Sequence, residues 1–439
     1  MPVSNPAVRP LGFRLAVVVV LTAMLAVAPT IGGILAIPVG LTSDPSASAT
    51  GFSCGRYEPV SPAGGVAHSV STQQELVHAM AAAGPGDTIN LATGSYSQIN
   101  YRSDHGHRSG TASAPIVIQA ASGAAPVVDA GDNGNPSRRI AVAIDRVDHV
   151  SVRGLEIRNG MFGALSRGSS SIAFEHNHIH RLVQVGVVSD AAQGPNGFEP
   201  STDTLIRCNS IHDSGLLEPE YGEGIYIGTG GAGAVDRTSG VLIEGNELYS
   251  IANEAIDVKR YTTNVTIRHN LIHDVTPYYG GAISLGLNKH DWGPANYLVE
   301  NNRIWNVSTA RHYAQAIAVA HGPTVIRDNV IWNIETRVSD TWPWTAAIQV
   351  HGDVNGADWA YGFGNPSATA IEITGNTLIG CNQGCIDSYT GSGQIKPTLT
   401  VKRNIVDRAS TGDAANDGDL IVSASDLVGP AIGRASCRE

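Results

Sequence analysis

The sequence predicts an all-β fold, a single-stranded right-handed parallel β-helix (a solenoid) with an N-terminal capping helix. Three observations predict it: a glycine-rich composition with few charges, a short Asn-marked strand unit that recurs along the chain, and a second apolar strand between these units. The chain of 439 residues contains 50 glycines and only 15% charged residues. Such a composition, with many Val, Ile, Thr and Asn, is typical of turn-rich β structure.

The recurring unit is an alternating apolar strand, then Asn, then Ile or Leu. It appears as SIAFEHNHIH, DTLIRCNSIH, GVLIEGNELY, NVTIRHNLIH, NYLVENNRIW, PTVIRDNVIW and AIEITGNTLI. The spacing of the Asn residues runs from 24 residues (Asn246 to Asn270) to 47 residues (Asn329 to Asn376), which fits one solenoid coil with insertions. Stacking the coils makes a continuous apolar core and lets each Asn bond its equivalent in the next coil. We therefore interpret the Asn column as structural. Its members are Asn177, Asn209, Asn246, Asn270, Asn302, Asn329 and Asn376.

The residue three places after each Asn is usually His or aromatic, and these residues should form a second column. Its members are His180, His212, Tyr249, His273, Trp305 and Trp332. A repeating aromatic column is more typical of a stacking ladder than of a metal site. We interpret this column as structural too.

The N-terminal segment has the order of a secretion signal. Arg9 and Arg14 precede an uncharged apolar stretch, residues 15–41, and small residues end at Ala49. This order predicts a signal peptide over residues 1–49, so the chain should be secreted. The apolar stretch is also long enough to span a bilayer, so an uncleaved anchor is the alternative.

The rest of the chain divides into a linker, a cap and the β-helix. We expect a linker at residues 50–70 and the cap helix with the first strands at residues 71–110. The helix should run from Thr72 to Ala83 with Leu76, Val77 and Met80 on one side, covering the open end of the first coil. The β-helix should occupy residues 111–431. Residues 432–439 resemble a translated sequencing adapter, so we expect the β-helix to be truncated at its C-terminus.

The charge of the chain limits its possible binding partners, and its cysteines limit the possible disulfides. The net charge is −11 and no run of Lys or Arg appears, which argues against nucleic acid. Outside the adapter-like end, Cys54, Cys208, Cys381 and Cys385 allow three disulfide pairings, and none has the spacing of a metal site. The short separation of Cys381 and Cys385 favours a local clip. We expect a monomer with no membrane contact beyond a possible N-terminal anchor.

A second apolar strand recurs between the Asn units, as GALSR, GVVSD, GIYIG, AIDVK, AISLG, AIAVAH, AIQVH and CIDSY. Its alternating apolar residues should face the core, so the residues between them should face outward. One outward column is Tyr226, Asp257, Ser284, Ala318, Gln349 and Asp387, and the next is Gly228, Lys259, Gly286, Ala320, His351 and Tyr389. The polar groups change from coil to coil, which indicates a functional site on a repetitive scaffold.

Charged residues are most closely grouped in two segments, GEGIYIG and, one coil later, NEAIDVKR. Stacking should bring Glu223, Glu254 and Asp257 together, within reach of one hard cation such as Ca²⁺. Lys259 should project from the same face. The structural alternative is a solvated cluster of ion pairs.

With these motifs the sequence resembles the β-helical polysaccharide lyases. The helix followed by PGDTINLATGSY and SAPIVIQA is similar to the opening of chondroitinase B and alginate lyases. In that family a Glu-x-x-x-x-Lys segment supplies a calcium ligand and a base, and Glu254 and Lys259 have this spacing. Asn253, Glu254 and Asp257 partly reproduce the acidic pattern of a calcium-dependent pectate lyase family. The chondroitinase-type Arg, expected near Gly286, is absent.

The resemblance implies calcium-assisted β-elimination on an acidic, uronic-acid-containing polysaccharide. Glu223, Glu254 and Asp257 would hold Ca²⁺, Lys259 would be the base, and Tyr226, Tyr278, Tyr279 or His290 would protonate the leaving oxygen. The candidate substrate-binding residues are Arg260, Tyr278, Tyr279, His321, His351, Trp342 and Trp344.

Other functions remain open at this point. A glycoside hydrolase would need two carboxyl groups about 5–9.5 Å apart, which Glu223, Asp257 or Asp387 could provide. An epimerase would leave the polysaccharide uncut. A glycan-binding or adhesive surface solenoid would bind without turnover, because fold does not imply function.

Overall fold

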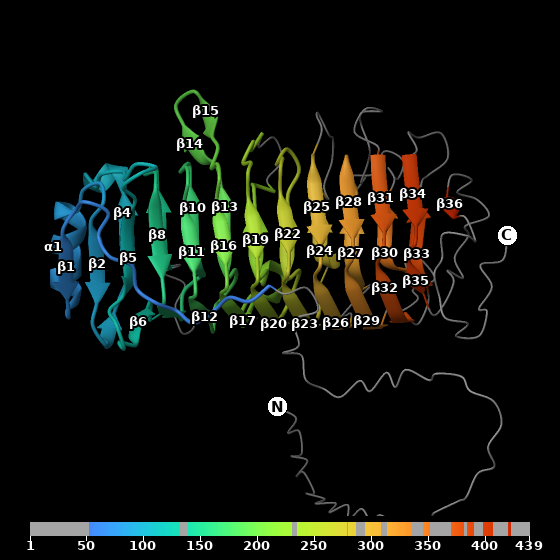
Figure 1. The fold of residues 1–439 in the computed structure, drawn as a ribbon, viewed down its shortest axis with the longest axis horizontal. Helices are drawn as coiled ribbons and strands as arrows, with labels where there is room; N and C mark the ends of the chain where they lie inside the picture. Colours follow the sequence, from blue (N-terminus) through green and yellow to red (C-terminus); the bar gives the residue numbers. More distant parts are fainter. Residues whose placement is uncertain are drawn as a thin grey trace, which may run out of the picture. The chain divides into compact units, whose positions relative to one another are not determined.

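The computed structural model describes residues 52–131, 139–230, 235–278, 280–286, 295–308, 314–335, 346–351, 370–381, 384–389, 398–406 and 420–422. It confirms the predicted parallel β-helix. Three long sheets of 13, 11 and 10 strands, here called sheets A, B and C, run along the fold with parallel pairing throughout (Figure 1). Each coil contributes a strand to A, then B, then C.

Sheet A carries the strands that precede the Asn column. Its members are β1 (Ala67–Val70), β2 (Thr88–Leu91), β5 (Ile116–Ala120), β8 (Val150–Arg153), β11 (Ala173–Glu175), β16 (Leu205–Arg207), β19 (Leu242–Glu244), β22 (Thr266–Arg268), β25 (Tyr297–Glu300), β28 (Thr324–Arg327), β31 (Ala370–Thr374), β34 (Thr398–Lys402) and β36 (Leu420–Val422). Sheet B follows the Asn column. It contains β3 (Gly94–Tyr96), β6 (Pro126–Asp129), β9 (Glu156–Arg158), β12 (His178–His180), β17 (Ser210–Ser214), β20 (Glu247–Ile251), β23 (Leu271–Val275), β26 (Arg303–Ser308), β29 (Val330–Glu335), β32 (Thr377–Cys381) and β35 (Ile405–Val406).

Sheet C is built from the second recurring strand of each coil. Its members are β4 (Ile99–Arg102), β7 (Ile140–Asp145), β10 (Phe162–Arg167), β13 (Val187–Asp190), β18 (Ile225–Ile227), β21 (Ile256–Val258), β24 (Gly281–Leu285), β27 (Gln315–Val319), β30 (Ala346–His351) and β33 (Gly384–Tyr389). A small antiparallel pair, β14 (Ala192–Gly194) and β15 (Gly197–Glu199), and two 3₁₀ turns, η1 (Ser103–His105) and η2 (Pro219–Tyr221), interrupt the coils.

The Asn column is structural, as predicted, and it extends one coil further to Asn404. The side-chain oxygen of Asn270 accepts from the backbone N–H of Asn246 at 2.9 Å and from its amide at 3.0 Å. The Asn246 amide also donates to the Ile206 carbonyl at 2.8 Å. The same bonds repeat from Asn177 to Asn404, and they satisfy buried polar groups at the corner between sheets A and B.

The aromatic column on sheet B is a continuous stack, also as predicted. Ring centroids lie 5.0 Å apart for His180 and His212, 4.5 Å for His212 and Tyr249, and 5.2 Å for Tyr249 and His273. Trp305 and Trp332 continue the stack. The parallel register of sheet B sets the ladder, because it places equivalent residues about 4.8 Å apart.

The predicted helix is present as α1 (Gln73–Ala82), capped by Thr72, whose hydroxyl accepts from the Glu75 N–H at 3.2 Å. Leu76, Ala79 and Met80 are buried. Val77 is 47% exposed, so its predicted place on the buried side was wrong. The buried side of the helix is formed by Leu76, Ala79 and Met80 instead. The helix contacts β1 and β2 at the N-terminal end of the coils (Figure 1). Shielding of the first coil by this helix stays a prediction.

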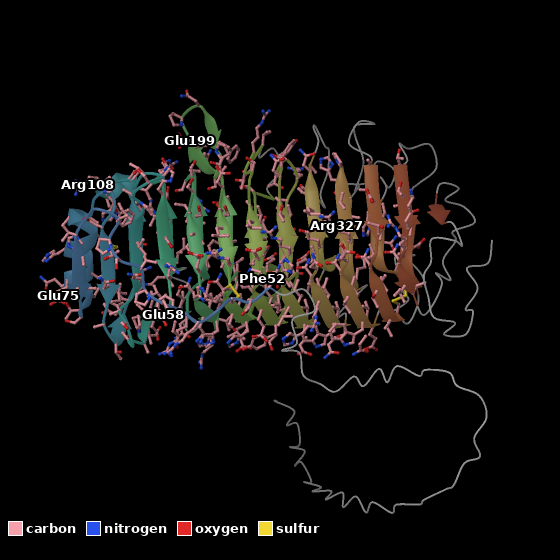
Figure 2. The ribbon with its side chains drawn as sticks, in the orientation of Figure 1. Phe52, Glu58, Glu75, Arg108, Glu199 and Arg327 are labelled. Atoms are coloured by element: carbon pink, nitrogen blue, oxygen red, sulfur yellow. A yellow bond between two sulfur atoms is a disulfide. The ribbon has the colours of Figure 1, made fainter. Side chains whose placement is uncertain are left out.

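Residues 52–66, here called the N-terminal strap, contact sheet A and its adjoining turns, and β1 at residues 67–70 belongs to that sheet. The described part of the expected linker, from residue 52 on, therefore packs on the β-helix. Cys54 and Cys208 form a disulfide. The ring of Phe52, labelled in Figure 2, stacks on His269 at 5.0 Å, and the Tyr57 hydroxyl donates to the Ala120 carbonyl at 2.7 Å. The strap thus crosses several coils.

Cys381 and Cys385 form the second disulfide, as the sequence favoured. The predicted signal at residues 1–49 and the adapter-like residues 432–439 lie outside the described residues. Within the described ranges, no helix is long and apolar enough to cross a membrane.

Replacing Cys54 by serine should lower the free energy of unfolding by about 2–5 kcal/mol under oxidising conditions. The reason is that the Cys54–Cys208 bond closes a loop of 154 residues. Urea-induced unfolding measures the effect. Cys381→Ser is the control and should cost less, because its disulfide spans only four residues. Equal effects would contradict the role of the strap.

Candidate functional site

The two outward columns of sheet C have the predicted register. Tyr226 pairs with Asp257 and Asp257 with Ser284, and the column continues through Ala318 and Gln349 to Asp387. Lys259, in the second column, is the first residue after β21, and its backbone N–H donates to the Ile227 carbonyl at 2.8 Å. Although these columns face away from the apolar core, Asp257, Ser284 and Gln349 are at most 1% exposed. The site is therefore much better shielded from water than an ordinary sheet surface.

Three carboxylates converge in this region, as the stacking argument predicted. Glu223 and Glu254 occupy the same place in successive coils, two residues before β18 and β21, and the Gly224 N–H donates to the Glu254 carbonyl at 3.0 Å. Asp257 projects from β21. Carboxylate oxygens of all three lie within 4.8 Å of one another, and the residues are 5%, 6% and 1% exposed. We call this group the acidic cluster.

The acidic cluster is only partly satisfied by hydrogen bonds. The Asn253 amide donates to Glu223 Oε1 at 3.2 Å and to the Glu220 carbonyl at 3.0 Å, while Asn253 Oδ1 accepts from the Tyr278 N–H at 3.0 Å. Lys259 Nζ contacts Asp257 Oδ2. Glu254 Oε2 and Asp257 Oδ1 are buried, and no described residue donates to them. Buried carboxylate oxygens without donors are costly unless a cation binds them.

Burial and mutual repulsion change the titration of this group. Burial, together with the charge of Asp257, raises the pKa of Glu223 to about 7. Burial also raises the pKa of Glu254 and of Asp257. For Lys259, burial is the largest single influence and opposes the charged form, but the charges of Asp257, Tyr226 and Glu254 and the bond to Asp257 together outweigh it and raise the pKa. The raised pKa values show that three ionised carboxylates so close together are unfavourable with one lysine as their counter-charge, and a bound cation would favour their ionised form.

The geometry fits a calcium ion. Two oxygens bound to one calcium ion at 2.3–2.6 Å cannot lie more than about 5 Å apart. The 4.8 Å limit among the three carboxylates meets this condition, and Glu254 Oε2 and Asp257 Oδ1 have free lone pairs. Glu223, Glu254 and Asp257 are therefore the residues that would hold such an ion.

Lys259 and Tyr226 lie side by side next to the acidic cluster. Lys259 Nζ lies 4.9 Å from the centroid of the Tyr226 ring, and the lysine side chain is 13% exposed. Gly230 leaves room for both, because a Cβ there would lie 2.6 Å from Tyr226 Oη and 3.3 Å from Lys259 Cε. Burial raises the pKa of the Tyr226 phenol, so it stays protonated at neutral pH. A candidate base and a candidate proton donor are thus adjacent.

The predicted substrate-binding residues have different surroundings. Arg260 is half-buried, with its guanidinium 5.4 Å from the Tyr261 ring. Tyr278 is half-buried and holds Asn253 through its backbone. His321 is buried and packs over Gly286, where an added Cβ would lie 2.6 Å from His321 Cβ. Gly286 stacks directly on Lys259, so an imidazole lies close to the place where the resemblance led us to expect Arg.

His351 lies three coils beyond Lys259 in the same column. It is 1% exposed, its Nε2 lies 3.3 Å from Gln315 Oε1, and burial lowers its pKa to about 3. The structure thus places a neutral imidazole away from the acidic cluster. The remaining predicted site residues, His290, Tyr279, Trp342 and Trp344, lie outside the described residues.

Sequence reasoning missed a ladder of alternating charges on the other side of the site. Arg102, Asp145, Arg167 and Asp190 occupy successive coils in the column that leads to Lys259. Arg167 forms two hydrogen bonds to Asp190, at 2.8 and 2.6 Å, and burial raises the pKa of Asp190 to about 6 despite this partner. The signal was present in the last residues of GALSR and GVVSD.

The pH dependence of stability should report on the acidic cluster. Glu223 holds its proton more tightly in the folded chain, so it stabilises the fold fully below pH 4.5, and this stabilisation is lost as the pH rises to about 7. The loss should amount to a few kcal/mol, at about 1.4 kcal/mol for each pKa unit. Chemical unfolding at pH 5 and pH 8 in chelator measures it.

The comparison with Glu223→Gln tests this group, because the variant removes the titration of Glu223 together with its effect on the pKa of Glu254. The variant should lose less stability between pH 5 and pH 8 than the unmodified chain. Parallel pH profiles would show that Glu223 titrates normally.

Comparison with known proteins places the chain among β-helix proteins. The family model described as "Right handed beta helix region" matches residues 141–427. A search of curated proteins finds no match. An alginate lyase from Paenibacillus sp. str. FPU-7 has a similar structure, with 23% identity, a TM-score of 0.54, and coverage of 79% of this chain and 96% of that one.

Two further solved structures are similar at lower scores. A pectate lyase shows 16% identity and a TM-score of 0.41, covering 80% of this chain and 76% of that one. A lacto-N-biosidase from Eubacterium ramulus shows 14% identity and a TM-score of 0.44, covering 78% and 67%. At these identities the likeness is one of fold. With the family model matching well over half of its length, the chain belongs to the right-handed β-helix family.

Proposed function

We propose that this chain is a secreted polysaccharide lyase that cleaves a uronic-acid-containing polysaccharide by calcium-assisted β-elimination. One observation carries the proposal: a buried acidic cluster with unpaired oxygens lies directly beside Lys259 and Tyr226 on the outer side of sheet C. A cation site, a candidate base and a candidate acid within one short stretch of two coils match the requirements of this reaction. The two disulfides support an oxidising, extracellular location.

The reaction needs one proton removed and one donated. Lys259 Nζ takes the proton from C5 of the uronic acid, the electron pair forms a C4–C5 double bond, and the C4–O bond breaks. Tyr226, kept protonated by burial, donates its proton to the departing oxygen. The Lys259 side chain is only 13% exposed and Tyr226 is half-buried, and this limited contact with bulk water strengthens their electrostatic action.

A calcium ion held by Glu223, Glu254 and Asp257 would pair with the substrate carboxylate, acidify the C5 proton and offset the negative charge that now raises the Lys259 pKa. Asn253 positions Glu223 for this role, and Tyr278 positions Asn253. The acidic polysaccharide would extend beyond the cleaved bond. There it would contact Arg260, the outward residues of two coils, and Arg167 in the charge ladder. His321 would lie beside Lys259.

The shared burial of three carboxylates around one point favours this function over glycoside hydrolysis, which needs two. A retaining pair needs carboxyl groups about 5–5.5 Å apart, and an inverting pair needs more. Here the oxygens lie within 4.8 Å of one another, and all three groups are buried together. Such a group suits one shared cation better than two separate catalytic roles.

The test is a substrate panel of pectate, alginate, glucuronan and glycosaminoglycans, with calcium and with chelator. We expect ultraviolet-absorbing unsaturated products from at least one acidic polysaccharide, and we expect chelation to abolish them. Asp257→Asn should weaken calcium binding and so raise the calcium concentration needed for activity, because it removes one ligand charge. Binding without any product across the panel, or new reducing ends without ultraviolet absorbance, would contradict the proposal.

A further inference from the structure

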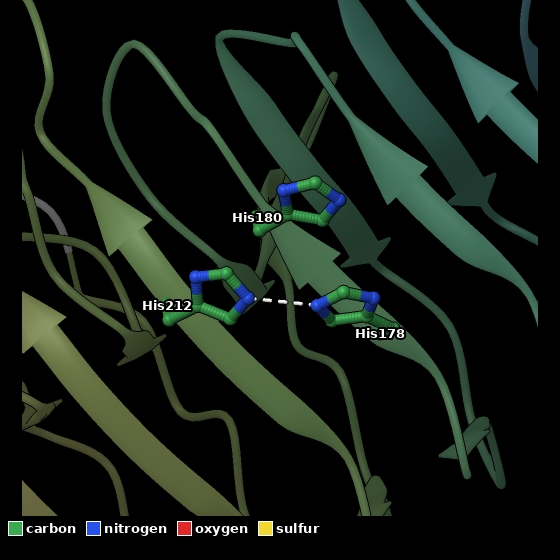
Figure 3. Close-up of side chains that lie close together, drawn as sticks. All are labelled: His178, His180 and His212. Atoms are coloured by element: carbon green, nitrogen blue, oxygen red, sulfur yellow. Dashed lines mark hydrogen bonds between the residues drawn. The ribbon is translucent and has the colours of Figure 1, made fainter.

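A second cluster of metal-ligand residues lies on sheet B. His178, His180 and His212 each offer a ring nitrogen, and these nitrogens lie within 4.8 Å of one another (Figure 3). No residue of this group belongs to the acidic cluster, which is built on sheet C. The cluster therefore stands independently of the proposed lyase activity.

The strand geometry explains why three histidines meet here. His180 and His212 are register partners in the aromatic ladder, on β12 and β17. His178 lies two residues before His180, so both side chains leave β12 on the outer face. The register partner of His178 in the next coil is Ser210, which shows that His178 is an addition to the ladder. This extra ring turns two stacked rings into a group of three.

The ring nitrogens of this cluster lie close together, and two of its rings favour the neutral form. His178 Nε2 and His212 Nε2 lie 2.7 Å apart, so only one of the two can carry a proton. Burial, together with the neighbouring imidazoles, lowers the pKa of His178, and burial lowers that of His180. Neutral imidazoles present the lone pairs that metal ions bind.

Carboxylates lie behind two of the three rings. Asp213 Oδ2 lies 3.0 Å from His212 Nδ1, which directs the lone pair of that ring to Nε2. Glu156 Oε1 lies 3.3 Å from His180 Nε2, and Arg158 bonds the same carboxylate at 2.7 Å. A carboxylate behind a ligand histidine is the usual outer arrangement of a zinc site, because it fixes the tautomer and raises the basicity of the ring.

We propose that His178, His180 and His212 bind a divalent transition-metal ion of imidazole preference, with zinc as the test ion. Three histidines with one remaining position for water make a four-coordinate set. With Zn–N bonds of about 2.0–2.1 Å, tetrahedral ligand nitrogens lie about 3.3 Å apart. The rings of His178 and His180 now stack at 15° and those of His180 and His212 at 17°, so an ion requires these rings to turn until their lone pairs converge; His178 is exposed and can turn to open the 2.7 Å separation from His212. The ion would join β12 and β17 across two coils.

The ladder supplies a matched pair of variants. His212→Phe and His273→Phe both replace a stacked ring with a stacked ring, but only the first removes a proposed ligand. His178→Ser removes the exposed ligand and installs the residue that already follows in its column. All three changes should preserve the fold, which circular dichroism verifies.

The experiment is a zinc titration of the full chain without a histidine tag, in a Glu254→Gln background that weakens the acidic cluster. We expect one zinc ion per chain, at least tenfold weaker binding after His178→Ser or His212→Phe, and unchanged binding after His273→Phe. Asp213→Asn should weaken binding by about 10–100-fold. Cobalt substitution should give the intense visible bands of tetrahedral nitrogen coordination.

Equal zinc affinity in the chain with and without His178 and His212 would overturn the proposal. So would an equal loss in His273→Phe, because the effect would then come from the ladder. His178→Ser made without the Glu254→Gln change should lose zinc and keep its lyase activity, because this site and the proposed active site are separate. Failure of the lyase assay leaves the zinc result unaffected.

Discussion

Replacing Lys259 by alanine should lower the rate of unsaturated product formation by about 10²–10⁴-fold. The reason is that Lys259 Nζ is the nitrogen base nearest to the acidic cluster among the groups that we have located there, and it already contacts Asp257. Lys259→Arg should not restore activity, because a guanidinium stays protonated and cannot accept the C5 proton. Ultraviolet absorbance of the released products measures the rate.

The control for this change is Lys402→Ala, an exposed lysine at the end of β34. It should leave the rate unchanged. Because Lys259 also offsets charge in the acidic cluster, calcium affinity must be measured in parallel. Calcium binding retained without turnover identifies Lys259 as the base, whereas full activity of Lys259→Ala would remove it from the reaction.

Replacing Asn270 by alanine should destabilise the β-helix by at least about 3 kcal/mol. Its Oδ1 accepts two hydrogen bonds from Asn246, and its amide donates to the Ile243 carbonyl and to Asn302. The substitution leaves several buried polar groups without partners, at about 1–3 kcal/mol each. Thermal and urea unfolding measure the effect.

Asn333→Gly is the matched control. Asn333 is exposed and has a positive φ of 54°, which glycine adopts without strain. It makes one side-chain bond, to Asn306, at 2.6 Å. A loss in Asn333→Gly as large as that in Asn270→Ala would show that the interior column contributes no more than an exposed contact.

Much of the fold could be predicted because each coil of a solenoid uses similar residues at equivalent positions, so the sequence repeats with the coil. Each coil repeats one environment, so the Asn column and the ladder follow from the spacing of Asn246, Asn270 and their equivalents. The N-terminal strap carried no such signal, because its contacts are with residues remote in the sequence: Cys54 contacts Gly245, which lies 191 residues further along the chain. Val77 was misplaced because α1 has only 10 residues, about three turns, and so short a pattern does not fix which side of the helix is buried.

The candidate site was predictable in register and less so in environment. The alternation of GIYIG and AIDVK placed Tyr226, Asp257 and Lys259 correctly relative to one another, since each strand repeats the last. Their burial and the bond from Asn253 to Glu223 depend on the segments that join the sheets, which have no period. The histidine cluster was hidden for a related reason: the ladder interpretation considers one column, and His178 belongs to the next.

The central claim, β-elimination at the acidic cluster, is tested most directly by the masses of the products from an acidic oligosaccharide of defined length. Elimination predicts two fragments whose masses add up to that of the substrate, one of them unsaturated. Fragments that together are heavier by one water would show hydrolysis. A substrate whose mass and length are unchanged would show epimerisation or binding alone, and either result would contradict the account.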